Sequence, residues 1–163
     1  MAKLLPPAPV TLEGDLLAGD ARIGIVVSRF NDFITSHLVT AAVDAFGRHG
    51  GDVRKLTFVY VPGSFEAPAT AQKMASSGKY DAIVCLGCVI RGATDHYEHV
   101  ASEAAKGIAQ VSLATGVPTI FGIITADTLE QAIERAGSKQ GNQGAKAIMA
   151  AIEMVNLYKQ LGT

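Results

Sequence analysis

The chain has 163 residues, the length of one domain with a substantial buried core. Its 15 acidic and 14 basic residues give a net charge of -1, a balance that argues against a nucleic acid or an anionic membrane as partner. No apolar run reaches the ~18 residues of a membrane span, and the proline-broken start is too short for a signal peptide, so we expect a cytoplasmic protein.

Apolar runs of strand type alternate with helical patterns from residue 23 onward. The predicted strands are 23–27, 56–61, 82–86 and 117–124, and the predicted helices are 33–49, 66–78, 94–116, 128–136 and 145–157. Successive strand–helix units with short links predict an α/β fold. We expect a three-layer α/β/α sandwich around a four-stranded parallel, flavodoxin-like sheet, whose ligands bind beyond the carboxyl ends of the strands.

The most informative stretch is the turn from the third strand into its helix, Gly87 to His96. A strand-to-helix turn presents unpaired backbone N–H groups and the positive end of a helix dipole, which suits phosphate. Helical spacing puts His96 at the head of the apolar stripe and His99 on the opposite, polar stripe. An imidazole beside a phosphate site can exchange protons near neutral pH. The alternative is a histidine that only packs on the loop.

Two further candidates follow the first and second strands. Phe30 lies in a polar turn, where it can stack on a flat heterocycle or plug the core. Glu66 lies in the first turn of a helix, where the dipole alone favours a carboxylate. Neither residue determines a function by itself.

Competing motifs are weaker. Cys85 and Cys88 have C-x-x-C spacing, but they precede the helix by several residues and no second pair exists, so we expect two reduced, buried thiols and no metal. A flavodoxin needs a loop rich in Ser, Thr and Gly after the first strand, whereas this chain has Arg29-Phe30-Asn31-Asp32. A receiver domain would have clustered acidic residues there and an aspartate at the end of the third strand.

Residues 23–157 closely resemble the lumazine synthase family in one register. Four motifs carry the resemblance: Arg29-Phe30-Asn31, Pro62-Gly63-Ser64-Phe65-Glu66, Val89-Ile90-Arg91-Gly92-Ala93-Thr94-Asp95-His96 and Arg135-Ala136-Gly137. This family of transferases joins 5-amino-6-(D-ribitylamino)uracil to 3,4-dihydroxy-2-butanone 4-phosphate in riboflavin biosynthesis. Imine formation, phosphate loss and ring closure give 6,7-dimethyl-8-ribityllumazine, without metal or cofactor.

The resemblance implies a role for each site residue. His96 would transfer protons, and Phe30 would stack on the pyrimidine. The ribitylaminouracil would be held by Phe30, Ser64, Phe65, Glu66, Phe121 and the backbone of Cys88, Val89 and Ile90. The ketone phosphate would be held by the N–H groups of Ala93 and Thr94 and by Arg135. Phe121 and Arg135 would come from the neighbouring subunit. By itself, Arg135 also suits the end of a helix, where a cation complements the dipole.

The resemblance also implies a homopentamer, either free or as one of twelve in a hollow shell, and an association with riboflavin synthase. The low charged content of 18% and the apolar terminal helix indicate an oligomer as well. Residues 10–13 would form a strand that pairs with the next subunit's sheet. We therefore divide the chain into an arm, 1–22, and one domain, 23–163.

One position departs from the family pattern. The usual lysine of a Gly-Asn-Lys-Gly turn is Gln143 here, which removes a positive charge near the phosphate site, and Lys139 is a candidate substitute. The alternative to an enzyme is a catalytically silent protein of the same fold that binds flavin or lumazine or forms a shell. The presence of Phe30, Glu66, His96 and Arg135 speaks against that alternative.

Overall fold

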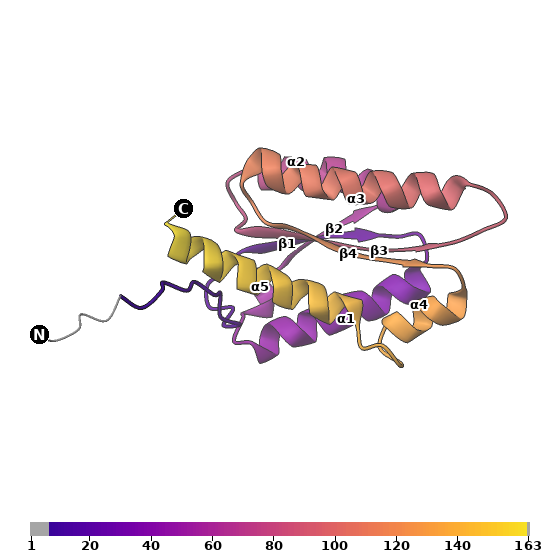
Figure 1. Ribbon diagram of the computed structural model, residues 1–163. Helices are drawn as coiled ribbons and strands as arrows, with labels where there is room; N and C mark the ends of the chain where they lie inside the picture. Colours follow the sequence, from indigo (N-terminus) through magenta and orange to yellow (C-terminus); the bar gives the residue numbers. More distant parts are fainter. Residues whose placement is uncertain (1–6, 163) are drawn as a thin grey trace, which may run out of the picture.

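The computed structural model describes residues 7–162, and it has three layers, with a parallel sheet between two layers of helices (Figure 1). The strands are β1 (Ile23–Ser28), β2 (Thr57–Val61), β3 (Ala82–Ile90) and β4 (Thr119–Ala126). The helices are α1 (Asp32–Arg48), α2 (Ala67–Ala75), α3 (His96–Thr115), α4 (Leu129–Arg135) and α5 (Gln143–Leu161), with 3-10 turns η1 (Val53–Lys55) and η2 (Ser64–Glu66). The predicted α/β fold is confirmed.

All pairings in the sheet are parallel, and the strand order is β2-β1-β3-β4. The chain runs from β1 outward to β2 and then crosses back to β3 on the other side of β1. The direction of winding therefore reverses between β1 and β3. In open parallel sheets, the loops at such a reversal separate and leave a crevice outside the carboxyl ends of the strands.

Two apolar cores lie on the two faces of the sheet. Helices α1 and α5 cover one face and α2 and α3 the other, as Figure 1 shows. The alternating side chains of β1 supply both cores: Ile25 faces α1 and α5, whereas Val26 faces α2 and α3. Both are fully buried. Each buried side chain of this size contributes about 1.5–3 kcal/mol to the free energy of unfolding, so the layers hold the strand ends firmly.

β3 is longer than the sequence predicts. The predicted strand ends at 86, but the observed strand continues to Ile90, because β4 pairs with it as far as Ile90 opposite Ala126. Gly87 is therefore a strand residue. The turn between β3 and α3 contains only 91–95, and α3 begins at His96, two residues later than predicted.

The segment before β1 packs on the last helix. Asn156 donates to the backbone oxygens of Asp15 and Leu17, at 3.0 and 2.9 Å, and Gln160 donates to the backbone oxygen of Glu13. The apolar side chains of α5 at Ala147, Ile148, Ala151, Ile152 and Val155 are buried in the core with α1, so part of the apolar content that indicated an oligomer is buried within the chain. Residues 10–13 form no strand with the described part of this chain, so the predicted pairing with a neighbour stays a prediction.

None of the helices within residues 7–162 is both long and apolar enough to cross a membrane.

Candidate active site

A cavity of about 700 Å³ opens at the carboxyl ends of β1, β2 and β3, where the topology predicts a crevice. It is lined by Phe30, Pro62, Gly63, Ser64, Phe65, Glu66, Cys88, Val89, Ile90, Gly92, Thr94, His96, Tyr97, His99 and Val100. The sequence-predicted residues that it brings together are Phe30, Ser64, Phe65, Glu66, Cys88, Val89, Ile90, Thr94 and His96. Residues up to 70 positions apart in sequence, Phe30 and Val100, thus border one cavity.

The turn after β1 presents Phe30, whose side chain is 70% exposed at the cavity. Asn31 holds this turn in place. Its backbone has a φ of 61°, and its side-chain N–H donates to the backbone oxygen of Cys88 at 2.8 Å. Asparagine tolerates this left-handed conformation better than most residues do. The aromatic ring is therefore tied to the end of β3, and it is not the core plug that the sequence left open.

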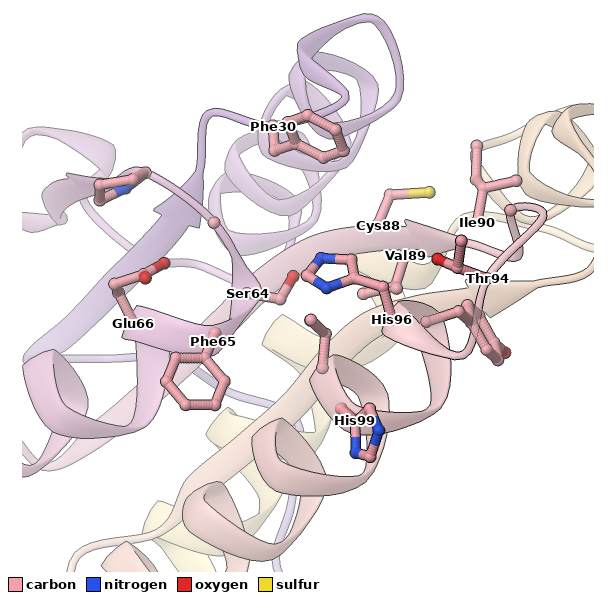
Figure 2. A pocket seen from close by; sticks show the side chains of 15 residues that line it. Phe30, Ser64, Phe65, Glu66, Cys88, Val89, Ile90, Thr94, His96 and His99 are labelled. Atoms are coloured by element: carbon pink, nitrogen blue, oxygen red, sulfur yellow. The ribbon is translucent and has the colours of Figure 1, made fainter.

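The turn after β2 supplies the polar side of the cavity. Ser64 begins η2 and is buried, and the side chains of Phe65 and Glu66 follow it. A Cβ atom at Gly87 would lie 2.5 Å from the Ser64 hydroxyl oxygen, so a glycine in β3 leaves the room that Ser64 occupies. Figure 2 shows Ser64 between the Glu66 side and the His96 side of the cavity.

The turn 91–95 carries the predicted phosphate site. Within residues 7–162, the backbone N–H groups of Ala93 and Thr94 have no hydrogen-bond acceptor. Both residues are exposed, and they lead directly into α3. Free amides at the start of a 20-residue helix suit an anion.

His96 opens α3, and its ring points across the cavity toward Ser64 (Figure 2). The residues one, two and four turns further along the same stripe, Val100, Ala104 and Val111, pack into the core that α3 shares with α2. This packing fixes the direction in which His96 projects. The predicted position of His96, over the carboxyl edge and at the end of the 91–95 turn, is confirmed, whereas its proton transfer and the binding of phosphate by the turn stay predictions.

His99 lines the cavity together with His96, although helical spacing assigns it to the polar stripe of α3. It is exposed, as expected for that stripe. Residues three apart in a helix are only about 60° apart around its axis, so both rings border the same opening. Pro62, Gly63, Gly92, Tyr97 and Val100 also line it and were not predicted. The signal for Val100 was present, since it shares the stripe of His96.

Phe121, Arg135 and Ala93 do not line the cavity among the described residues. Ala93 lies between two residues that do. Phe121 is 37% exposed on β4, an edge strand, and Arg135 is exposed at the end of α4, where its guanidinium donates to the backbone oxygen of Gln131 at 3.2 Å. The predicted contribution of Phe121 and Arg135 to a neighbouring subunit's site stays a prediction.

The two cysteines are free and buried. Burial raises the pKa of the Cys85 thiol to about 12 and that of the Cys88 thiol to about 11. Both side chains are therefore neutral thiols at physiological pH, which makes them poor nucleophiles. The chemistry of the cavity must come from its other groups.

A comparison with known protein families agrees with this geometry. Residues 20–159 match the sequence model of the family described as 6,7-dimethyl-8-ribityllumazine synthase. The matched range includes all residues that line the cavity, together with Phe121 and Arg135. The chain belongs to the 6,7-dimethyl-8-ribityllumazine synthase family, the lumazine synthases of riboflavin biosynthesis.

Proposed function

We propose that the protein condenses 5-amino-6-(D-ribitylamino)uracil with 3,4-dihydroxy-2-butanone 4-phosphate to give 6,7-dimethyl-8-ribityllumazine, inorganic phosphate and water. The observation that carries the proposal is one cavity in which an exposed aromatic ring faces a histidine beside two free amides. The family membership is consistent with this reaction.

The pyrimidine half of the reaction occupies the side of the cavity made by β1 and η2. Phe30 stacks on the ring, which is a large flat surface that water solvates poorly. Ser64, Phe65 and Glu66 bind the ribityl chain and the ring edge. The backbone of Cys88, Val89 and Ile90 supplies donors and acceptors to the same substrate on the edge of β3 that faces β1, because β1 pairs with β3 only as far as Leu86.

The ketone half occupies the side made by the 91–95 turn. The amides of Ala93 and Thr94 donate to the phosphate, and Arg135 of a neighbouring subunit neutralises its charge. His96 lies between the two substrates. Imine formation and phosphate elimination each require proton transfer near neutral pH, for which an imidazole is suited. Holding the two substrates in contact supplies much of the remaining acceleration.

The proposal requires an oligomer, since Phe121 and Arg135 do not line the cavity of their own chain among the described residues. Large apolar side chains at the surface support assembly: Leu113 is 88% exposed, and Phe33, Leu129 and Ile133 are also exposed. The assembly that fits a shared site is a pentameric ring, as a free pentamer or within a shell, with residues 10–13 paired to the next subunit's sheet.

The test is to mix the purified protein with the two substrates and to follow the absorbance and fluorescence of the lumazine. Turnover that saturates in both substrates supports the proposal. Binding of the lumazine without turnover would instead favour the catalytically silent protein of the same fold. A protein that shows no binding of the lumazine and no turnover would contradict both functions.

A further inference from the structure

The turn that presents the Ala93 and Thr94 amides makes few stabilising contacts through its central residues. Residues 91–95 are all exposed, and within the described part of the chain the N–H groups of Gly92, Ala93 and Thr94 make no hydrogen bond. A turn that binds an anion through backbone groups must nevertheless keep those groups aligned, because a small misplacement costs much of the binding. Some contact outside the turn must therefore define its shape.

Arg91, the first residue of the turn, makes such contacts. Its Nε donates to Asp127 Oδ1 at 2.9 Å, and a second guanidinium nitrogen donates to Glu98 Oε1 at 3.1 Å. Its backbone N–H donates to the oxygen of Ala126 at 2.8 Å, which extends the pairing of β3 with β4 by one bond. The guanidinium carbon also lies 4.6 Å from the centre of the Tyr97 ring.

These contacts span the turn from end to end. Asp127 follows β4, and its own N–H donates to the side chain of Gln131 at 2.8 Å in the first turn of α4. Glu98 and Tyr97 lie in the first turn of α3, beyond the other end of the turn. Arg91 thus links the ends of β3 and β4 to the start of α3, which carries His96. A planar guanidinium can bond two carboxylates at once, and a lysine cannot do so in the same geometry.

The side chain of Arg91 does not itself serve the cavity. Among the described residues, Gly92 and Thr94 line it and Arg91 does not. The two carboxylates also offset its charge. Hydrogen bonds to Asp127 and Glu98 raise the pKa of Arg91, so it stays a cation engaged with these partners. Exposed ion pairs of this kind add little to the stability of a fold. A role in shaping the turn accounts for three converging contacts better than stability does.

We propose that Arg91 is a positioning residue, which holds the 91–95 turn through Asp127 and Glu98 so that the Ala93 and Thr94 amides converge on the substrate phosphate. This inference rests on the proposed function, since it names what shapes the phosphate half of that site.

The test compares Arg91→Gln, Arg91→Lys and Asp127→Asn with the wild type. A matched control is Arg48→Gln, which breaks an exposed ion pair of 2.8 Å at the far end of α1. Two quantities are measured for each: the dissociation constant of inorganic phosphate by calorimetry, and the KM of the phosphorylated ketone. We expect all three variants to weaken phosphate and to raise this KM about tenfold. Binding of the ribitylaminouracil and the melting temperature should not change, and the control should behave as the wild type.

The Asp127→Asn variant separates positioning from direct binding. If the Arg91 guanidinium contacted the phosphate itself, removal of the Asp127 carboxylate would leave more of the Arg91 charge available to the phosphate. Phosphate binding would then become tighter. If Arg91 positions the turn, the same change weakens binding, and the Arg91→Gln, Asp127→Asn double variant is no worse than either single variant. Tighter binding in Asp127→Asn, full function in Arg91→Lys, or unchanged constants in all variants would each overturn the proposal.

The measurements also distinguish this inference from the proposed function. A wild type that turns over both substrates while the variants match it leaves the function intact and refutes the role of Arg91. A wild type that binds phosphate without synthase activity refutes the function, and the phosphate constants of the variants then decide the role of Arg91. A wild type with neither activity nor phosphate binding refutes both.

Discussion

Single side chains border two parts of the cavity, which the proposed function assigns to a heterocycle and to a phosphate. Phe30 and Ser64 border one part, and Thr94 borders the other, with His96 between them (Figure 2). Each residue reaches its place through local structure. Phe30 depends on the left-handed Asn31, Ser64 on the absence of a side chain at Gly87, and His96 on the start of α3.

The role of His96 can be tested directly. His96→Ala should lower kcat by about ten- to a thousandfold, the usual contribution of a general acid–base group, and should leave pyrimidine binding almost unchanged. His37→Gln is the control, because His37 is exposed on α1 and does not line the cavity among the described residues. Steady-state kinetics and a titration with the pyrimidine substrate measure both effects. Wild-type turnover in His96→Ala would remove the catalytic assignment.

The proposed function predicts that Arg135→Ala and Phe30→Ala weaken the binding of different substrates. Arg135→Ala should weaken the phosphorylated ketone by about 1.5–3 kcal/mol, the contribution of a charged hydrogen bond, and should spare the ribitylaminouracil. Phe30→Ala should do the reverse through lost stacking. Each variant is titrated with each substrate. An equal loss for both substrates in either variant would indicate a structural role for that residue.

Contacts between elements determine how α1, α4 and α5 lie relative to one another. The side chain of Asn142 caps α5, accepting from the N–H groups of Gly144 and Ala145 at 2.8 and 3.2 Å. The same side chain donates to the backbone oxygens of His37 in α1 and Ala136 after α4, at 3.2 and 2.9 Å. One asparagine thus joins three helices beside Arg135, so the place of Arg135 depends on this junction.

The close approach of α5 to α1 gives a stability prediction. A Cβ atom at Gly144 would lie 2.0 Å from the backbone oxygen of Leu38, and backbone cannot move aside easily. Gly144→Ala should therefore destabilise the protein by about 1–3 kcal/mol, a drop of about 3–10 °C in melting temperature.

Gly47→Ala is the matched control for this prediction. Gly47 is exposed within α1, and its added Cβ would meet Val53 Cγ1 at an ordinary 3.4 Å. This variant should gain about 0.5–1 kcal/mol, because alanine loses less conformational entropy in a helix. Thermal melts of the two variants should shift in opposite directions. A Gly144→Ala variant as stable as the wild type would mean that α5 does not approach α1 this closely.

At the scale of the whole molecule, the cavity of one chain is incomplete for the proposed reaction. Phe121 and Arg135 are exposed and do not line it among the described residues, and several large apolar side chains are exposed elsewhere. The proposed function accounts for both facts by an assembly in which a neighbour's β4 and α4 complete each cavity. The wild type should therefore show a light-scattering mass of five chains or a multiple of five. An active monomer would contradict the shared site.

Mixed assemblies test the shared site more sharply. His96→Ala and Arg135→Ala are each expected to be weakly active alone. When the two are co-expressed in equal amounts, about one site in four receives an intact His96 from one subunit and an intact Arg135 from its neighbour. Activity should rise to about a quarter of the wild-type value. No gain over the separate variants, at a confirmed mixed composition, would mean that both residues act within one chain.

The sequence by itself determined the order and type of the elements and much of the site. Strand and helix periods are local, because side chains two or three to four positions apart share a face. The parallel arrangement follows from the alternation of strands and helices, and it places Phe30, Glu66 and His96 at one edge of the sheet. The motif resemblance then identified the family that the family match confirmed.

Only the tertiary structure decided the features that depend on distant partners. β3 runs to Ile90 because β4 pairs with it, and this shortens the turn to 91–95. His99 borders the cavity because α3 packs on α2 at one particular rotation. Arg91 meets Asp127, 36 positions away, only because their strands are adjacent. Periodicity describes which way a side chain points from its own element, whereas these contacts depend on how elements pack against one another, which no local pattern encodes.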